Sequence, residues 1–385
     1  MAAMEKNNKN LNVPNLRFPE FSGEWDITTI GEISNIKNGP FGSVLHAEDY
    51  VSDGIPIVTT EHFKSGSLPI VKDGIPQVSE QDYIRLKGYK LQTNDIVFSR
   101  VGSVDINAYV SDTQNGWLFS GRVLRVRPIS SVNSLCLHFV LSTEKVKQSI
   151  RSRAVGQTMP SINTPILSIT NIFLPKSLEE QRKISIFLAL IDARLETQKK
   201  IIEKYESLIR GLCEKLTRQG DTNKSINECL ECHSSTLQES EVLETGRYPV
   251  YGAIGVCGYT DTPDVSGDGI LIIKDGASVG VTYFADGSYS SIGTLNRLTA
   301  KKGINLRSVY YCIKVMNFAP YKTGLAIPHI YFKDYGKHKI WCPSYEQQSR
   351  IADALTNIDN KIYVEKLLLE QLNSQKRYML NQLFI

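Results

Sequence analysis

One serine stands in a pattern that other proteins use for nucleophilic chemistry. Residues Gly276 to Gly280 read G-A-S-V-G and fit the pattern G-x-S-x-G, with Ser278 at its centre. In enzymes with this motif a strand turns sharply into a helix and leaves the serine oxygen exposed. Here the following residues, Val281 to Phe284, have the composition of a strand. We therefore predict a glycine-rich turn between two strands, and a serine hydrolase that uses Ser278 is the alternative.

A second pattern combines two cysteines with a histidine. Cys229, Cys232 and His233 form the string C-x-x-C-H, the attachment sequence of c-type haem. That attachment takes place outside the cytosol, and the first residues contain no apolar stretch typical of an export signal. A zinc site needs two more ligands at suitable spacing, and the sequence has no second C-x-x-C. We predict that these cysteines are incidental and that the chain itself holds no metal or cofactor.

The remaining motifs and the composition favour a soluble protein without catalytic chemistry. The sequence has no G-x-x-x-x-G-K-[ST] phosphate loop, no H-E-x-x-H and no NPPY-like or DPPY-like string of an amino-methyltransferase. Its 385 residues carry 44 basic and 40 acidic side chains, which argues against a protein that coats nucleic acid with positive charge. Seven scattered cysteines suit a reducing cytosol, and no apolar run is long enough to span a membrane. We expect a cytoplasmic protein whose nucleic-acid contacts come from local clusters.

Three clusters of basic residues are candidates for such contacts. Lysine and arginine supply the salt-dependent phosphate contacts of DNA binding, whereas base edges need forked or amide donors such as Arg, Asn and Gln. Ordinary solvated surface explains each single residue equally well. The clusters are Arg122, Arg125 and Arg127; Lys145, Lys147, Arg151 and Arg153; and Lys333, Lys337, His338 and Lys339.

Two long helices must position these clusters, and the chain contains their apolar seam twice. The seam residues alternate steps of four and three, the 3.5-residue period of a coiled coil. Each seam residue of the second helix lies 167 positions after its counterpart, so the polar Gln198 recurs as Glu365. The first seam is Ile184, Leu188, Ile191, Leu195, Gln198, Ile202, Tyr205, Ile209, Leu212 and Leu216, and the second is Ile351, Leu355, Ile358, Ile362, Glu365, Leu369, Leu372, Lys376, Met379 and Leu383.

Capping signals predict where both helices begin. Ser177 with Glu180, and Ser344 with Gln347, fit the capping box, in which the serine accepts an amide hydrogen bond and the N3 side chain reaches back. We expect the helices to pair antiparallel within one chain, with Gln198 and Glu365 in neighbouring layers; pairing between two chains is the alternative.

The segments between these helices are rich in strand and turn signals, which makes the fold class α+β. Within the first of them, residues 135–149 are expected to form a helix. We predict two mixed α/β globular domains joined and spaced by the two helices, a duplicated, pseudo-twofold plan. The expected parts are a flexible tail over 1–15, globular domains over 16–177 and 221–343, and helices over 178–220 and 344–385.

The two globular segments also repeat each other faintly. Residues 100–103, R-V-G-S, resemble residues 274–277, K-D-G-A, at an offset of 174. Residues 156–162, G-Q-T-M-P-S-I, resemble residues 324–330, G-L-A-I-P-H-I, at an offset of 168. The glycine, proline and isoleucine match, whereas the residues between them differ. Two domains that recognise different ligands would keep the residues that fix the backbone and differ in the residues between them. Sequence drift in a duplicated structural domain is the alternative.

Taken in order, these features resemble the specificity subunits of type I restriction-modification systems. The resemblance rests on L-R-F-P-E-F at residues 16–21 with Trp25, on the paired helix entries at 175–184 and 343–351, and on the two globular repeats. It covers nearly the whole chain. It implies a non-catalytic subunit with two target-recognition domains, each reading one half of a bipartite DNA target. It also implies that the helices act as a ruler between the half-sites.

The resemblance further implies partner proteins. Two methyltransferase subunits would dock on the helices, bind S-adenosylmethionine and methylate adenine, and two restriction subunits would use ATP and Mg²⁺ in the full complex. A coiled-coil adaptor that binds proteins and no DNA is the alternative from another class. The helix positions implied for spacing and docking are Ile184, Ile191, Gln198, Tyr205, Ile351, Ile358, Glu365 and Leu372.

By position, the resemblance implies one DNA-reading surface in each globular domain. The second domain lacks the L-R-F-P-E-F opening and differs in the loop after Gly324, so His329 could instead support the fold. The first surface would include Arg100, Ser103 and Asn107 after the Asp95–Ser99 strand, with Gln157 and Thr158, and we add Arg122 from the basic cluster. The second would include Lys274, Ser278 and Tyr283, with Leu325, Ala326 and His329 around Pro328.

Overall fold

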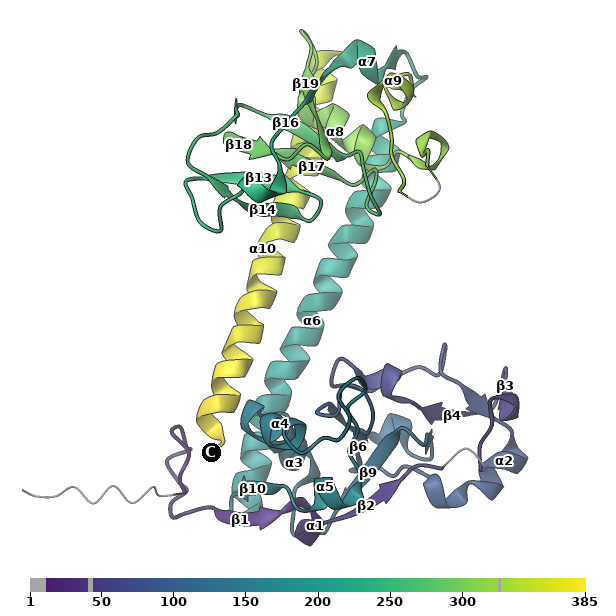
Figure 1. The fold of residues 1–385 in the computed structure, drawn as a ribbon, viewed down its shortest axis with the longest axis vertical. Helices are drawn as coiled ribbons and strands as arrows, with labels where there is room; N and C mark the ends of the chain where they lie inside the picture. The colour runs from purple at the N-terminus through teal and green to yellow at the C-terminus, as the bar shows by residue number, and fades with distance from the viewer. Residues whose placement is uncertain (1–11, 41–43, 325–326) are drawn as a thin grey trace, which may run out of the picture. The chain divides into compact units, whose positions relative to one another are not determined.

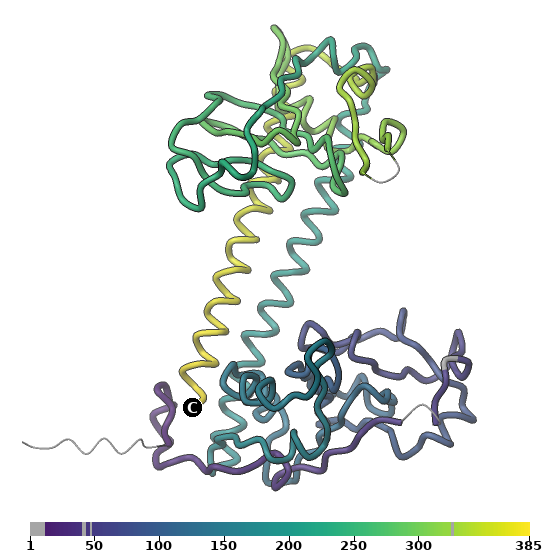
Figure 2. Tube along the Cα trace, in the orientation of Figure 1, coloured from purple at the N-terminus to yellow at the C-terminus, as the bar shows by residue number. Residues whose placement is uncertain are grey.

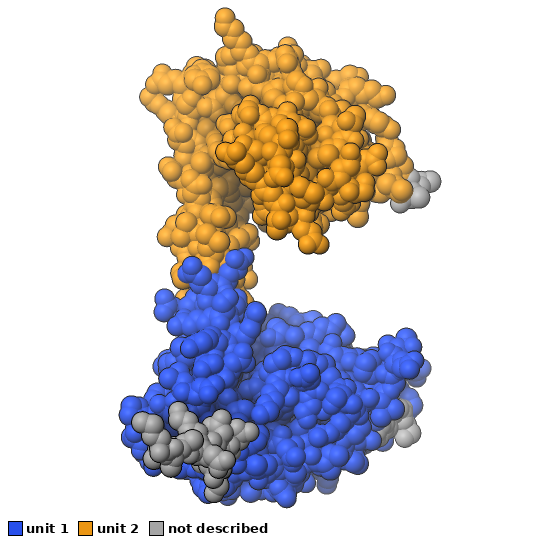
Figure 3. Space-filling view, turned by 60° about the vertical axis from the view of Figure 1, so that its left-hand side comes forward, with its two compact units in different colours: residues 1–196, 370–385 blue, residues 197–369 orange. Residues whose placement is uncertain are grey.

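The computed structural model describes residues 12–40, 44–324 and 327–385, which form two compact units (Figure 3). Unit 1 is Met1–Glu196 with Glu370–Ile385, and unit 2 is Thr197–Leu369. Each unit contains one globular region and one half of each of two long helices. Of the tail predicted over 1–15, residues 1–11 lie outside the described residues, and the Asn12 carbonyl accepts a hydrogen bond from the Trp25 amide at 2.8 Å.

The long helices are α6 (Leu178–Thr217) and α10 (Tyr345–Leu383). In each unit one half of α6 lies beside the opposite half of α10, so the helices pair antiparallel within one chain (Figure 2). Ion pairs join them in both units: Lys376 contacts Asp192 at 2.5 Å in unit 1, and Lys366 contacts Glu206 at 2.6 Å in unit 2. Every predicted seam residue is buried or half-buried. The seam prediction is therefore confirmed.

The two polar seam residues contact each other inside unit 2. Gln198 Nε2 donates to Glu365 Oε2 at 2.6 Å and to the Glu365 carbonyl at 3.0 Å. Lys361 lies 2.8 Å from the same carboxylate, and hydrogen bonds from Lys361 and Gln198 lower the pKa of Glu365. A polar pair in an apolar seam lowers stability but selects one register. These residues therefore oppose sliding of one helix along the other.

Each long helix begins one residue after its predicted serine cap. The Glu180 amide donates to Ser177 Oγ, and the Gln347 amide donates to Ser344 Oγ, both at 3.4 Å. These bonds satisfy one of the free amides in the first turn of each helix.

The second half of the predicted capping box is wrong for α6, because the Glu180 side chain has other partners. Arg17 Nε and Nη2 each donate to the Glu180 carboxylate at 2.8 Å, and Trp25 Nε1 donates at 3.2 Å. Glu180 is only 2% exposed. A buried carboxylate is stable only when paired and hydrogen-bonded, so the L-R-F-P-E-F segment serves as the counter-charge at this helix entry.

A pair of buried glutamines that the sequence reasoning missed ties each long helix to its globular region. Gln181 Nε2 donates to the Pro175 carbonyl, and its Oε1 accepts from the Asn133 amide, both at 2.8 Å. Gln348, 167 positions later, repeats both bonds with Pro343 at 2.9 Å and Asn305 at 2.8 Å. The recurrence of a glutamine at the 167-residue offset of the helix seams is the feature of the sequence that could have predicted this contact.

Unit 1 contains two four-stranded sheets (Figure 1). One has the antiparallel order β2-β9-β6-β7, and the other has the order β3-β5-β4-β8 with β4 and β8 parallel. A separate antiparallel pair joins β1 to β10. The elements are β1 (Asp26–Thr29), α1 (Ile30–Ile33), β2 (Ser34–Asn38), β3 (Tyr50–Val51), β4 (Ile55–Val58), β5 (Gln77–Val78), α2 (Glu80–Arg85), β6 (Ile96–Ser99), β7 (Asn107–Tyr109), β8 (Leu118–Phe119), β9 (Val123–Pro128), α3 (Ser134–Leu141), α4 (Glu144–Arg151), α5 (Thr164–Ser168) and β10 (Asn171–Leu174).

Unit 2 repeats the first sheet and the separate strand pair, and it repeats three strands of the second sheet. Its first sheet has the antiparallel order β12-β19-β16-β17, its second has the order β14-β13-β18-β15 with β13 and β18 parallel, and β11 pairs with β20. The second sheets share the arrangement β5-β4-β8 and β14-β13-β18, but the fourth strand pairs with β5 in unit 1 and with β18 in unit 2. The shared order of the first sheet and of these three strands confirms the duplicated α+β plan. The elements are β11 (Lys224–Ser225), α7 (Ile226–Cys229), β12 (Leu230–Ser234), β13 (Tyr248–Gly252), β14 (Gly255–Thr260), β15 (Val265–Ser266), β16 (Gly269–Ile273), β17 (Thr282–Ala285), β18 (Ser288–Ser291), β19 (Leu295–Ala300), α8 (Leu306–Lys314), α9 (Phe332–Tyr335) and β20 (Lys339–Ile340).

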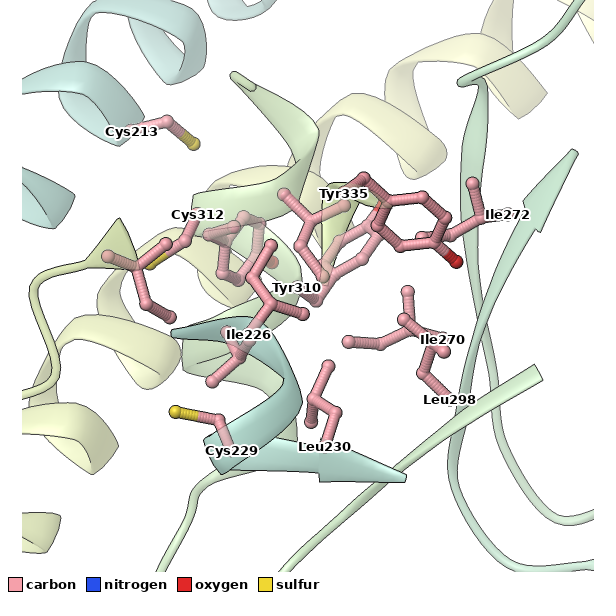
Figure 4. Packing of buried hydrophobic residues seen from close by; sticks show 14 of the residues in the cluster. Cys213, Ile226, Cys229, Leu230, Ile270, Ile272, Leu298, Tyr310, Cys312 and Tyr335 are labelled. Atoms are coloured by element: carbon pink, nitrogen blue, oxygen red, sulfur yellow. The ribbon is translucent and has the colours of Figure 1, made fainter. Parts of the chain in front are cut away.

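The core of unit 2 joins the first sheet to the helices. Figure 4 shows Ile270, Ile272 and Leu298 of the sheet packed with Tyr310 and other buried side chains of the unit.

In unit 1 the helix predicted over 135–149 is instead two helices, α3 and α4, which is a correction. Ser142 Oγ donates to the His138 carbonyl at 2.8 Å and Thr143 Oγ1 to the Val140 carbonyl at 2.7 Å, so the two hydroxyls end α3.

Candidate nucleic-acid interface

In unit 1 the turn that follows β6 docks on the 155–161 loop. The Gly102 amide donates to the Pro160 carbonyl at 2.8 Å, and the Ile162 amide donates to the Arg100 carbonyl at 2.9 Å. The loop closes on itself through two hydrogen bonds between Val155 and Ser161, at 2.8 and 2.9 Å. We call this turn and loop together the turn–loop module. It brings the two segments that the sequence repeats to the same end of the sheet.

Unit 2 contains the same turn–loop module. The Gly276 amide donates to the Pro328 carbonyl at 2.9 Å, and the Ile330 amide donates to the Lys274 carbonyl at 2.9 Å. Thr323 and His329 exchange two backbone hydrogen bonds, at 2.8 and 2.9 Å, as Val155 and Ser161 do in unit 1. The matched glycine, proline and isoleucine positions are therefore the frame of the module, and the residues that differ lie on its loop.

Of the side chains predicted for the first reading surface, four lie in the unit 1 module, whereas Arg122, before β9, and Asn107, on β7, lie outside it. Ser103, Gln157 and Thr158 are exposed. Arg100 is half-buried, donates from Nη1 to the Gly121 carbonyl at 3.2 Å, and bonds through its backbone amide to the carbonyl of the exposed Arg122 at 3.0 Å. Together they offer hydroxyl, amide and guanidinium donors, the groups that contact phosphates and base edges.

Asn107 is in addition buried, since its side chain is only 2% exposed. Its Oδ1 lies 2.6 Å from His138 Nδ1, and its Nδ2 donates to Ser142 Oγ at 3.2 Å. Asn107 thus links β7 to the end of α3 inside unit 1, and we leave it out of the proposed surface. The expectation failed because a short polar side chain at the start of a strand resembles a turn residue in sequence.

The buried histidine beside Asn107 predicts how the stability of the protein depends on pH. Burial, with Lys376 and Lys147 adding to it, lowers the pKa of His138 from 6.5 to about 3. Between pH 6.5 and 3 the unfolded chain binds a proton that the folded chain does not. The free energy of unfolding should therefore decrease as the pH is lowered from 6.5 to 3, by up to about 1.4 kcal/mol per pH unit.

Denaturant titrations at pH 7, 6 and 5 check this expectation against the variant His138→Gln. Glutamine keeps a polar partner for Asn107 but does not titrate, so the variant should lose less stability than the unmodified protein between pH 6.5 and 5. Equal pH slopes in the two proteins would contradict it.

In unit 2 the predicted residues Lys274, Ser278 and His329 lie in the module with different chemistry, whereas Tyr283 lies on the strand β17. Lys274 is half-buried and paired with Asp275 at 2.9 Å, Ser278 is exposed, and Tyr283 Oη donates to the Ala253 carbonyl at 3.2 Å. His329 is half-buried, and its ring centroid lies 5.5 Å from that of Tyr331. The predicted residues Leu325 and Ala326 lie outside the described residues.

One protein family matches this chain twice. The type I restriction modification DNA specificity domain matches residues 22–206 and 222–374. The chain belongs to this family. Two specificity subunits of type I restriction enzymes from Methanocaldococcus jannaschii, named MjaX and MjaVIII, are each 24% identical to it. The alignments cover 94% and 96% of this chain and 93% of each relative.

Solved structures share the fold of this specificity-family chain. The S subunit of a type I restriction-modification system from M. genitalium aligns with a TM-score of 0.67 and 19% identity, covering 97% of this chain and 99% of that one. A chain from a structure that concerns complex assembly and conformational transition of the type I R-M system has a TM-score of 0.54 and 15% identity, covering 93% and 97% of the two chains. Both likenesses support the predicted α+β architecture with its long helices.

The basic residues near the unit 1 module mostly have internal partners in this specificity protein. Arg125 is 6% exposed and donates to Asn35, and Arg127 donates to both oxygens of Asp95 at 2.6 and 2.7 Å. Neither forms an exposed patch, which corrects the grouping of Arg122, Arg125 and Arg127. Arg125 and Arg127 share one face of β9, and their partners there, Asn35 of β2 and Asp95 before β6, are distant in the sequence.

The two motifs with apparent chemistry have structural explanations. The segment after Gly280 is the strand β17 and not a helix, so Ser278 does not sit on a nucleophile elbow. Burial raises the pKa of Cys229 to about 12 and of Cys232 to about 11, so both thiols stay protonated at neutral pH. Within the described ranges no three His, Cys, Asp or Glu side chains gather as a metal site would require. No helix in those ranges is long and apolar enough to cross a membrane.

Proposed function

We propose that this protein is the DNA-reading scaffold of a type I restriction-modification complex, in which each unit reads one half of a bipartite target. The observation that carries the proposal is the turn–loop module, which has one backbone frame in both units and different exposed side chains. Ser103, Gln157 and Thr158 in unit 1 supply uncharged donors and acceptors, whereas the unit 2 module presents Ser278 and His329. Two frames with different side chains suit two half-sites of different sequence.

The helices are proposed to set the distance between the half-sites and to dock two methyltransferase subunits. The outer helix faces are left for partners, because the seam positions are buried or half-buried: Ile184, Ile191, Gln198, Tyr205, Ile351, Ile358, Glu365 and Leu372. Apolar side chains stand on those faces: Leu190 of α6 is 65% exposed and Tyr363 of α10 is 64% exposed. S-adenosylmethionine, ATP and Mg²⁺ would bind to the methyltransferase and restriction subunits, and this chain would carry no catalytic residue.

Methylation of genomic DNA provides the test of this function. Co-expression with the methyltransferase subunit of the same system, followed by methylome sequencing, should reveal adenine methylation at one asymmetric motif with an unspecified gap. Replacing residues 16–177 by the matching segment of another specificity subunit should change one half-site only. Lengthening the chain around Gln219–Lys224 should change the gap and leave both half-sites unaltered. A motif without a gap, or a swap that alters both halves, would contradict the proposal.

A DNA-binding measurement distinguishes the proposed function from the alternative of an adaptor that binds only proteins. A DNA reader loses affinity steeply as salt rises, because lysine and arginine release counterions from phosphates. A titration of duplex DNA at several salt concentrations should show this dependence for the scaffold, and an adaptor that binds only proteins should show no binding at any salt concentration.

A further inference from the structure

Unit 2 contains a groove where the end of α8 meets the two long helices. Its volume is about 470 Å³, and it is lined by α6, α8 and α10. Ile209, Val315 and Ile362 give it an apolar floor, and Arg210 stands among the lining residues. None of these side chains belongs to the turn–loop module of unit 2.

Unit 1 contains a groove at the corresponding place, lined by the region between α3 and α4 and by α10 without a residue of α6. It lies where the end of α3 and the start of α4 meet α10, and its volume is about 780 Å³. Ser142, Thr143, Lys147, Arg377 and Leu380 are among its lining residues.

The two grooves occupy equivalent positions in the duplicated plan. Arg377 follows Arg210 by 167 residues, the offset of the helix seams, and Leu380 follows Cys213 by the same offset. At the end of the short helix, Val315 of unit 2 corresponds to Thr143 of unit 1 at an offset of 172, the offset between the helix-capping residues Asn133 and Asn305. A feature present once per repeat suits a partner that is present in two copies.

The repeated arginines carry unpaired charge in both grooves, and in unit 1 Lys147 and Glu370 also form no ion pair within the described residues. In unit 2 the other charges pair internally, Lys314 with Asp359 at 2.9 Å and Lys366 with Glu206 at 2.6 Å. Arg210 and Arg377 are exposed, and their side chains make no ion pair or hydrogen bond within the described part of the chain. A guanidinium with five free donors binds a carboxylate in a bidentate manner.

We propose that each groove docks a carboxylate-bearing segment from one of two copies of the same partner protein, with Arg210 and Arg377 as the anchoring cations. This inference rests on the proposed function, which supplies the methyltransferase subunit as that partner. The wall carboxylates of the unit 2 groove, Glu206 and Asp359, are neutralised by Lys366 and Lys314, which leaves Arg210 to attract an incoming carboxylate. The apolar floor of the unit 2 groove, in turn, suits the side chains of a protein segment better than a sugar-phosphate backbone.

The test counts partners on the full-length chain. The protein is co-purified with the methyltransferase subunit of the same system, and native mass spectrometry measures the ratio of the two chains. The unmodified protein should bind two partner copies, Arg210→Glu and Arg377→Glu one copy each, and the double variant none. Arg247→Glu, at an exposed arginine that directly precedes β13 and lies outside both grooves and both long helices, is the matched control and should bind two copies.

Other outcomes separate the inference from the function on which it rests. Two partner copies on the double variant overturn the groove assignment and leave the proposed function intact. No partner copy on the unmodified protein contradicts the proposed function itself. Weaker binding of duplex DNA by the isolated variants, with both partner copies retained, would make the grooves phosphate sites and also overturn the inference. Thermal unfolding of each variant identifies any that lose partners because they do not fold.

Discussion

Replacing Arg17 by methionine is expected to destabilise unit 1 by about 3–5 kcal/mol, the usual effect of removing one member of a buried ion pair. Arg17 holds the Glu180 carboxylate through two hydrogen bonds of 2.8 Å, and the two side chains are 13% and 2% exposed. Methionine fills similar space without the charge. The carboxylate would then remain buried with only the Trp25 indole as donor, at 3.2 Å.

Chemical denaturation of the full chain, followed through the tryptophan fluorescence, measures this effect. Arg350→Met is the matched control, because Arg350 pairs with Glu346 at 2.6 Å in the first turn of the other long helix. Both of those side chains are 76% exposed, so the change should cost less than about 1 kcal/mol. Adding Glu180→Gln to Arg17→Met should restore most of the loss, since the amide needs no counter-charge and still accepts from Trp25. Equal losses for Arg17→Met and Arg350→Met would contradict the buried-pair argument.

The features that could be predicted from sequence are those that depend on a periodic or repeated residue pattern. The seam of α6 and α10 follows from a 3.5-residue period that any helix of this length must bury, and its repeat at a constant offset indicated the duplication. The frame of the turn–loop module was also visible, because Gly102 with Pro160, and Gly276 with Pro328, recur in matched strings. Both rest on backbone requirements that few residue types satisfy.

The features that sequence could not reveal depend on partners far away in the chain. Glu180 fits a local capping box, yet Arg17, 163 positions away, binds its carboxylate. Arg127 reads as an exposed phosphate ligand until Asp95 is placed beside it. Asn107 reads as a turn residue until His138 covers it. In each case the residue type predicts a polar contact. Only the tertiary fold determines whether the partner is another residue of the chain or a ligand.

Gly156→Ala should abolish recognition of one half-site and leave the rest of the protein folded. Gly156 has a φ of +100°, and a Cβ there would lie 2.8 Å from the Met159 carbonyl oxygen. The strained backbone alone costs about 1–3 kcal/mol for a residue other than glycine, and the clash forces the loop that carries Gln157 and Thr158 to move. Gly74→Ala is the control, because Gly74 has a φ of +76° in the same unit, and a Cβ there would meet nothing within 4 Å.

The two variants separate backbone strain from displacement of the proposed reading loop. Both should unfold at similar denaturant concentrations, slightly below the unmodified protein, whereas only Gly156→Ala should lose methylation of the gapped motif. Gly324→Ala provides the second arm, since its Cβ would lie 2.4 Å from the Ile327 carbonyl oxygen at a φ of +88°. DNA libraries randomised in one half-site at a time should then show that Gly156→Ala relaxes selection in one half and Gly324→Ala in the other. If both variants relaxed the same half, the two modules would not read separate parts of the target, and the assignment of one half-site to each unit would fail.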